Sequence, residues 1–70
     1  MSAAALKNHI RTFRVLADLT QEEIAQKAGV TRQTIIAIEK GNYTPSVQLA
    51  LRLARTLGHP VEELFYEESE

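Results

Sequence analysis

Two adjacent residues, Arg32 and Gln33, carry side chains well suited to recognising another molecule by hydrogen bonding. An arginine guanidinium matches the two acceptors on the edge of guanine, and a glutamine amide matches the donor and acceptor of adenine. Ile36 and Ala37 follow about one helical turn later, and small apolar groups can contact the methyl group of thymine. If these four side chains share one face of a helix, that face has the chemistry to read base pairs in the major groove of duplex DNA.

The four side chains share a face if residues 31–40 form a helix. At 100° per residue, such a helix divides into two arcs. The inner arc contains Thr31, Ile35, Ile38 and Glu39. The outer arc contains Arg32, Gln33, Ile36, Ala37 and Lys40. A face that is only solvated rarely combines an isoleucine and an alanine with a glutamine and two cations, so the outer arc predicts a surface that binds a partner.

A second helix is predicted directly before this one. Thr20 and Glu23 have the types and spacing of a capping box, in which each side chain bonds the backbone amide of the other residue. The helix that they start ends at Gly29, which suits a left-handed backbone, and Thr31 caps the next helix. Ala25 is small where the two helices should approach most closely. The segment therefore predicts a helix-turn-helix, with an ordinary helical hairpin as the alternative.

The remaining helices are predicted from apolar residues at steps of three or four and from capping residues. A first helix is expected from residue 3 or 4 to residue 17. A fourth helix of about eleven residues follows a cap at Ser46 or Thr44 and ends at Gly58. A short fifth helix covers residues 61–65. No alternating run is long enough to predict a strand, so the expected fold class is all-α.

Length and composition indicate one domain. Seventy residues with 44% apolar composition make a single core, expected over residues 6–66, and an acidic tail covers residues 67–70. The chain has no cysteine and only two histidines, so neither a disulfide framework nor a metal centre is expected. We expect a cytoplasmic protein without a membrane segment, because no signal-peptide pattern and no long apolar run is present.

Charge is distributed unevenly along the chain. The net charge is −1 and the isoelectric point is about 6.1, which by itself disfavours nucleic-acid binding. Residues 1–46, however, carry six Lys or Arg against four Asp or Glu, a balance of +2, whereas residues 47–70 carry two against five, a balance of −3. Neither part holds a clustered acid, base and nucleophile or a glycine-rich phosphate loop. An enzyme, a cofactor or a small-molecule ligand is therefore not expected.

The sequence resembles the lambda-repressor-like helix-turn-helix regulators, also called the Cro/C1 or XRE type, over nearly the whole chain. The resemblance rests on Leu-Thr-Gln-Glu-Glu at 19–23, Gly-Val-Thr-Arg-Gln-Thr-Ile at 29–35, Ile-Glu-Lys-Gly at 38–41, Pro-Ser at 45–46 and Val-Glu-Glu-Leu-Phe at 61–65. It implies a compact five-helix domain whose second and third helices form the helix-turn-helix. It also implies a transcriptional regulator that binds double-stranded DNA.

The resemblance assigns DNA contacts along and around the recognition helix, Thr31 to Lys40. Together with the outer arc, it puts base-reading roles on Arg32, Gln33, Ile36 and Ala37. It implies phosphate contacts for Gln21, Thr31, Thr34, Lys40, Asn42 and Tyr43. These roles agree with physical chemistry, because phosphate contacts fix the register of a reading helix and helix N-termini favour anions.

The resemblance further implies an ion pair between Arg14 and Glu39. Glu39 lies on the inner arc of the third helix, where an unpaired charge would be costly to bury. The pair would support the recognition helix as a structural element. The alternative is that the two charges are separately solvated.

A symmetric homodimer on an inverted-repeat operator is expected. One reading helix covers only a few base pairs, whereas a two-fold dimer places two such helices about 34 Å apart on the duplex. On a helical wheel of the fourth helix, Leu49 lies at the edge of the arc expected to face the core, which contains Val47, Ala50, Leu51, Leu53, Ala54 and Leu57. The fourth and fifth helices together carry more apolar side chains than so small a core is expected to bury. The expected interface residues are Leu49, Val61, Leu64, Phe65 and Tyr66. The alternative function is an antitoxin-like or other protein-interaction module, in which the acidic tail binds a protein and DNA binding is secondary.

Overall fold

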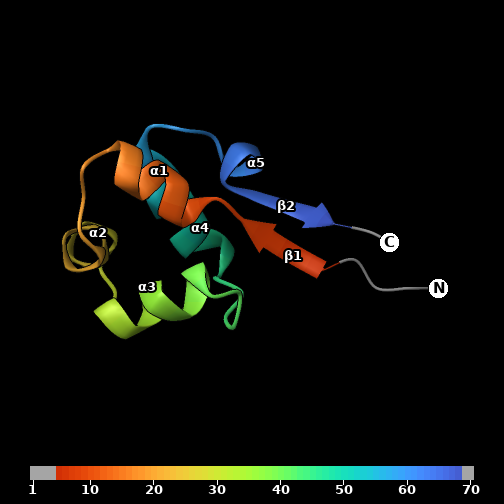
Figure 1. The fold of residues 1–70 in the computed structure, drawn as a ribbon, viewed down its shortest axis with the longest axis horizontal. Coiled ribbons are helices and arrows are strands. Elements are labelled where there is room, and N and C mark those ends of the chain that lie inside the picture. Colours follow the sequence, from red (N-terminus) through yellow and green to blue (C-terminus); the bar gives the residue numbers. More distant parts are fainter. Residues whose placement is uncertain (1–4, 69–70) are drawn as a thin grey trace.

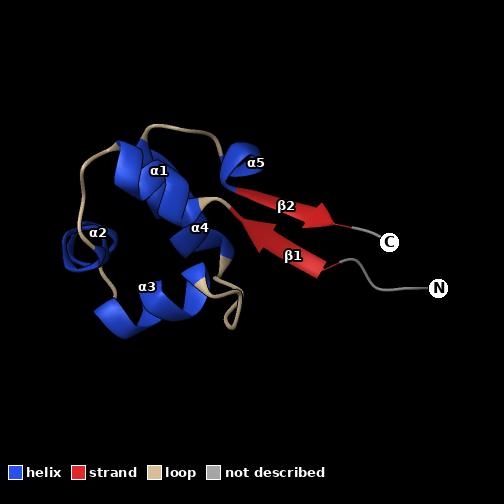
Figure 2. Cartoon of the chain, viewed as in Figure 1, coloured by secondary structure: helices blue, strands red, loops and turns tan. Residues whose placement is uncertain are grey.

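The computed structural model describes residues 5–68, which form five helices and one two-stranded sheet. In chain order the elements are β1 (Ala5–Asn8), α1 (Ile10–Leu16), α2 (Gln21–Ala28), α3 (Arg32–Glu39), α4 (Val47–Leu57), α5 (Val61–Leu64) and β2 (Phe65–Glu68). The helices pack into one body, and the β1–β2 ribbon projects from it on the side where both ends of the described chain lie (Figure 1). Figure 2 shows the same division by secondary structure.

Side-chain caps start three of the helices. The capping box of α2 forms as predicted: Thr20 Oγ1 accepts from the Glu23 amide at 3.0 Å, and the Thr20 amide donates to Glu23 Oε1 at 2.9 Å. The bond from the Thr20 amide holds the pKa of the Glu23 carboxyl below its usual value. Thr31 caps α3, and Ser46 rather than Thr44 caps α4 by accepting from the Leu49 amide. Each of these three helices therefore begins at a side chain that satisfies an otherwise free amide.

The core lies where α2, α3 and α4 meet, closed by the start of α1 and the end of α5. Six large apolar side chains are fully buried: Ile10, Ile24, Ile35, Ile38, Leu53 and Leu64. Smaller Ala25 and Ala28 fill the inner face of α2. Because α3 contributes two of the six large side chains, burial of its inner arc holds it against the other helices. No helix within residues 5–68 has the length and apolar character needed to cross a bilayer.

The two-stranded sheet corrects the expectation of an all-α fold. Residues 5–8 were assigned to the first helix by their apolar spacing, but they form β1 and pair antiparallel with β2, Ala5 opposite Glu68 and Asn8 opposite Phe65. Accordingly, α1 begins only at Ile10, and α5 ends one residue earlier than predicted. The physical reason is that a strand ladder is formed between opposite ends of the chain, which a local periodicity cannot detect.

The ribbon also changes the interpretation of the acidic tail. Its first two residues, Glu67 and Glu68, are part of β2 instead of a free segment. The expected start of the first helix at residue 3 or 4, and the last two tail residues, lie outside the described residues. The first half of the predicted tail is therefore part of the two-stranded sheet.

The face that α4 turns toward the core also differs from the prediction. Val47 and Leu51 were placed on the core side, yet they are 77% and 50% exposed. Leu49, expected at the edge of that face, is buried, together with Ala50, Leu53 and Leu57. The predicted arc is therefore wrong at one edge, because the packing of α4 against α2 decides which of its apolar residues are buried.

Candidate nucleic-acid interface

The outer arc of α3 faces away from the core. Arg32 and Gln33 are exposed, Ile36 and Ala37 are half-buried, and Ile35 and Ile38 on the opposite arc are fully buried. In Figure 1, α3 lies along one outer side of the fold. The side chains predicted to contact bases are thus brought together on one accessible surface, at the spacing that the helix dictates.

A tight turn sets the angle between α2 and α3. Three residues separate the helices, and the first of them, Gly29, is left-handed at φ 75°. The amide of Val30 then donates to the carbonyl of Ala25 at 2.9 Å, which closes the end of α2. Ala25 is only 3% exposed, and Val30 packs against the core. This is helix-turn-helix geometry, in which a small buried residue allows close approach and an apolar turn residue fixes the bend.

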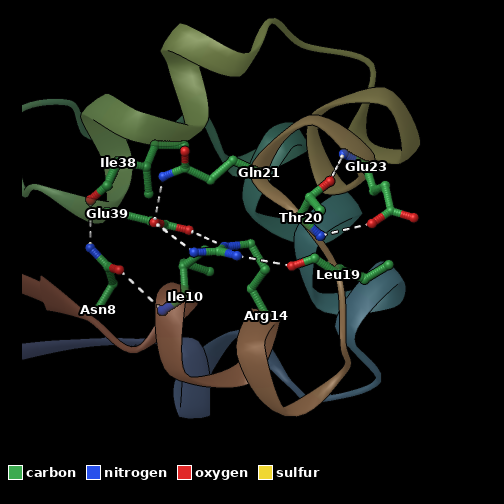
Figure 3. Close-up of polar contacts among 9 residues, drawn as sticks. All are labelled: Asn8, Ile10, Arg14, Leu19, Thr20, Gln21, Glu23, Ile38 and Glu39. Carbon is green, nitrogen blue, oxygen red and sulfur yellow. Dashed lines mark hydrogen bonds and ion pairs between the residues drawn. The ribbon is translucent and has the colours of Figure 1, made fainter.

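A polar network beneath α3 joins it to α1 and α2 (Figure 3). Arg14 Nε donates to Glu39 Oε2 at 2.7 Å, and Arg14 Nη1 donates to the carbonyl of Leu19 at 2.9 Å. Gln21 Nε2 donates to the other carboxylate oxygen, Glu39 Oε1, at 3.1 Å. The Arg14 and Glu39 side chains are 12% and 6% exposed. Both carboxylate oxygens of Glu39 are therefore occupied by donors from neighbouring helices.

The network fixes the last turn of α3 relative to the start of α2. A nearly buried ion pair is destabilised strongly when one partner is removed, because the other charge is left without a counterion. Because water reaches neither side chain easily, each charge depends on the other as its partner. The Arg14–Glu39 pair therefore acts mainly to hold α3 in position. The structure brings Arg14 and Glu39 together as the resemblance implied, and it adds Gln21 as a third member.

Asn8 is a member of the same framework that sequence reasoning missed. Its Nδ2 donates to the carbonyl of Ile38 at 2.8 Å, and its Oδ1 accepts from the amide of Ile10 at 3.1 Å (Figure 3). One side chain thus joins β1, the start of α1 and the end of α3. An asparagine two residues before an apolar helical run is a recognisable local cap. Its second partner, thirty residues away, leaves no local signal.

The predicted phosphate-contacting residues surround α3. Thr31 and Thr34 bond one another at its start, with 3.1 Å between their hydroxyl oxygens. Lys40, Asn42 and Tyr43 are exposed just beyond its last residue. Gln21 lies alongside the helix and lines two shallow hollows. One hollow includes Arg32 and the other includes Ile36 and Lys40. The structure therefore places these polar groups on both sides of the outer arc.

The predicted interface residues do not form one surface. Leu49 and Leu64 are 6% and 0% exposed, so assigning them to a dimer interface was wrong, because core packing within one chain already covers both. Phe65 is half-buried against that core. Val61 is half-buried and Tyr66 exposed, so these two stay accessible. An apolar groove between α4 and α5 is instead lined by Leu51, Ala54, Arg55, Gly58, His59, Pro60, Val61 and Glu62.

Both histidines are engaged in packing contacts. The His9 ring stacks on Tyr66 with 4.7 Å between ring centroids, and the His59 ring lies 4.1 Å from that of Phe13. His59 Nδ1 also lies 2.8 Å from Glu63 Oε2. Among residues 5–68, no group of three or more histidine, cysteine, aspartate or glutamate side chains is arranged to hold a metal ion.

Comparison with known proteins shows similarity to DNA-binding regulators. A family model described as "Helix-turn-helix" matches residues 10–64. An uncharacterized HTH-type transcriptional regulator of Methanocaldococcus jannaschii is 52% identical over 66 residues, which are 93% of this chain and 100% of that protein. The cryptic phage CTXphi transcriptional repressor RstR of Vibrio cholerae is 44% identical over 55 residues, 79% of this chain and 50% of RstR. The crystal structure of the restriction-modification controller protein C.AhdI from Aeromonas hydrophila superposes with a TM-score of 0.73 at 30% identity, covering 77% of this chain and 78% of that one.

Proposed function

The chain belongs to the helix-turn-helix family, in its Cro/C1 or XRE type, and on that basis we propose that it is a dimeric transcriptional regulator whose α3 reads an inverted-repeat operator in the major groove. The observation that carries the proposal is the outer arc of α3, where Arg32 and Gln33 are exposed beside half-buried Ile36 and Ala37. A helix with such a face fits the major groove, and its side chains match base edges there.

Direct readout falls to the two turns of α3. Arg32 offers a two-pronged donor for guanine, and Gln33 offers a donor and an acceptor for adenine. Ile36 and Ala37 supply apolar contacts for thymine methyl groups. The buried inner arc and the Arg14–Glu39 pair hold the helix rigidly, so the reading side chains need little reordering on binding.

Affinity comes mainly from the phosphate contacts. Gln21, Thr31 and Thr34 lie beside the first part of α3 or along it, and Lys40, Asn42 and Tyr43 follow its end. Such contacts position the protein without reading sequence. The net charge of −1 is compatible with this role, because acidic residues concentrate after residue 46 and the strand that carries Glu67 and Glu68 projects from the helical body.

The face that supports a dimer is formed by α4 and α5. Val47 and Leu51 lie one turn apart on α4 and are 77% and 50% exposed, and Leu51 leads into the apolar groove beside Val61. Side chains this large and this exposed are costly in a chain of seventy residues, and contact with the same face of a second copy would cover them. We therefore place the two-fold interface there instead of at Leu49 and Leu64.

Selection from a random duplex pool tests the function. The purified protein is incubated with duplexes at moderate salt, and bound molecules are amplified and sequenced over several rounds. We expect one enriched motif with two inverted half-sites, about one helical turn apart from centre to centre. A matched selection with a variant carrying both Arg32→Ala and Gln33→Ala is the control and should enrich no such motif. If the folded wild-type protein enriches nothing, the proposed function is wrong.

A further inference from the structure

A hollow beside α3 is lined by Arg11, a cationic residue to which no DNA contact has been assigned. It lies where α1, α2 and the end of α3 meet, and its lining residues are Arg11, Arg14, Gln21, Ile36, Glu39 and Lys40. Ile36 belongs to the outer arc of α3, so the hollow opens next to the face proposed to lie in the major groove. A duplex that receives α3 in its major groove brings its backbone against the walls beside that helix.

The charges around the hollow leave a positive balance. Glu39 is the only acid among the lining residues, and it is already bonded by Arg14 and by the Gln21 amide. Within residues 5–68, Arg14 forms an ion pair with Glu39 and the His59 ring lies beside Glu63, and neither contact includes Arg11 or Lys40. Both of these side chains are exposed. Within the described residues, the hollow therefore presents two unpaired cationic side chains, Arg11 and Lys40, because the charge of Glu39 is already neutralised by Arg14.

The donors that surround the hollow are those that bind a phosphodiester. Guanidinium groups bind phosphate oxygens through two parallel N–H donors, which gives both charge and geometry. A primary amide such as that of Gln21 has two donor hydrogens, and the bond to Glu39 uses one of them. The network beneath α3 thus holds Gln21 at the wall of the hollow that Arg11 also lines, and one N–H of its amide is not used by the bond to Glu39.

We propose that Arg11 binds a DNA backbone phosphate in this hollow, together with Gln21 and Lys40, so that α1 contributes to the DNA interface. The proposal rests on the proposed function, because it requires α3 to lie in the major groove. It assigns to Arg11 a positioning contact that carries no base preference.

This contact is tested by removing the charge of Arg11 and, separately and together with it, neutralising single phosphates of the DNA. Affinity for the selected duplex is measured for wild type, Arg11→Ala and Arg11→Lys across a range of salt concentrations. Lys27→Ala is the matched control, because it also removes one exposed cation, from a hollow on the α4 side that is shared with Leu19 and Thr56. We expect Arg11→Ala to weaken binding roughly tenfold, the size of one charge-assisted hydrogen-bonded contact. Its log–log salt slope should become shallower by about 0.9, the value for one lost phosphate contact.

The two other variants should separate this contact from a general effect of charge. Arg11→Lys is expected to restore the slope with intermediate affinity, and Lys27→Ala should retain the wild-type slope. Each phosphate of the half-site is then replaced singly by a neutral methylphosphonate. One replacement should weaken wild type and Lys27→Ala but leave Arg11→Ala unaffected, since the variant has already lost that contact.

Two results would overturn the assignment. One is an Arg11→Ala slope equal to that of wild type. The other is that every methylphosphonate weakens binding by Arg11→Ala as much as it weakens binding by wild type. That result would mean that Arg11 acts only through net charge. Failure of the proposed function itself is distinguishable, because wild type would then show no specific duplex to measure. Thermal melting of each variant without DNA confirms that the comparison is between folded proteins.

Discussion

Arg14 Nε lies 2.7 Å from Glu39 Oε2, which joins α1 to the last residue of α3 at a nearly buried position. The same carboxylate accepts from Gln21 on α2, so one acidic side chain connects three helices. Together with the buried inner arc of α3, this contact holds the end of α3 against α1 and α2 in the free protein. Its loss should therefore be visible before any DNA is added.

Arg14→Ala and Glu39→Ala are expected to destabilise the fold. Each removes one partner of a nearly buried pair, at a cost of about 3 to 5 kcal/mol of unfolding free energy. Thermal or denaturant unfolding without DNA measures the effect. The double variant should lose less than the sum of the two single variants, because it leaves no unpaired charge. Wild-type melting of both single variants, with binding lost, would show that the pair acts in recognition and not in folding.

Arg32→Ala and Gln33→Ala are expected to change base preference. Each should cost about 1 to 3 kcal/mol on the selected site and relax discrimination at particular base pairs. Lys40→Ala is the control, because a phosphate contact weakens all sequences alike and makes the salt slope shallower. The measurement is affinity for a panel of single-base-pair variants of the site. An unchanged preference profile in both reading variants would contradict the assignment.

The two hydrogen bonds of Asn8 can be separated by substitution. Asn8→Asp keeps an acceptor for the Ile10 amide but loses the donor to the Ile38 carbonyl, whereas Asn8→Ala loses both bonds. We expect each lost bond to cost about 1 kcal/mol of unfolding free energy. Both variants should also increase hydrogen exchange at the Gly41 amide, which bonds the same carbonyl at 2.9 Å. If exchange at Gly41 in Asn8→Asp matches wild type, Asn8 acts only as the cap of α1.

The capping box of α2 predicts a pH-dependent contribution to stability. Hydrogen bonding by Thr20, first by its amide and then by its side chain, lowers the pKa of Glu23 in the folded state below the ordinary value of 4.5. A carboxyl whose pKa is lowered by folding stabilises the protein above its unfolded pKa, and this contribution is lost as the pH falls through the folded value. The stability advantage of wild type over Glu23→Gln should therefore decline below pH 4.5.

Unfolding of wild type and Glu23→Gln over a pH series measures this decline. Glu22→Gln is the matched control, because it removes the same charge from the same helical turn without touching the capping box. A constant difference between wild type and Glu23→Gln across the series would argue that the carboxylate form has no special role in the cap.

Leu51→Glu is expected to prevent formation of the proposed dimer. Leu51 is half-exposed, so the substitution should leave the fold intact while placing a charge in the proposed interface. Leu16→Glu is the control, since Leu16 is 75% exposed on α1, outside the groove. Sedimentation at micromolar concentration measures the state of each protein. A wild-type monomer that stays monomeric on DNA, or a Leu51→Glu variant that remains a dimer, would exclude this interface.

Sequence alone determined the helix-turn-helix and which face of α3 is exposed. The capping box at Thr20, the left-handed Gly29 and the cap at Thr31 act within a few residues of themselves, so their signals are complete in the local sequence. The inner arc of α3 is equally local, because Ile35 and Ile38 recur at helical spacing and both are fully buried. The residues proposed to contact bases follow from that arc.

Other features depend on the tertiary structure, because the local sequence is compatible with more than one arrangement of residues 5–8 and of α4. Residues 5–8 have helical spacing, yet they gain more by pairing with β2, a partner at the far end of the chain. Leu49 and Leu51 are both apolar enough to be buried, and the packing of α4 against α2 buries Leu49 and leaves Leu51 half-exposed. Asn8 reaches a carbonyl thirty residues away. In each case a contact between segments that are distant in the sequence stabilises one arrangement over the other. Sequence periodicity predicts an element but does not identify the surface against which that element packs.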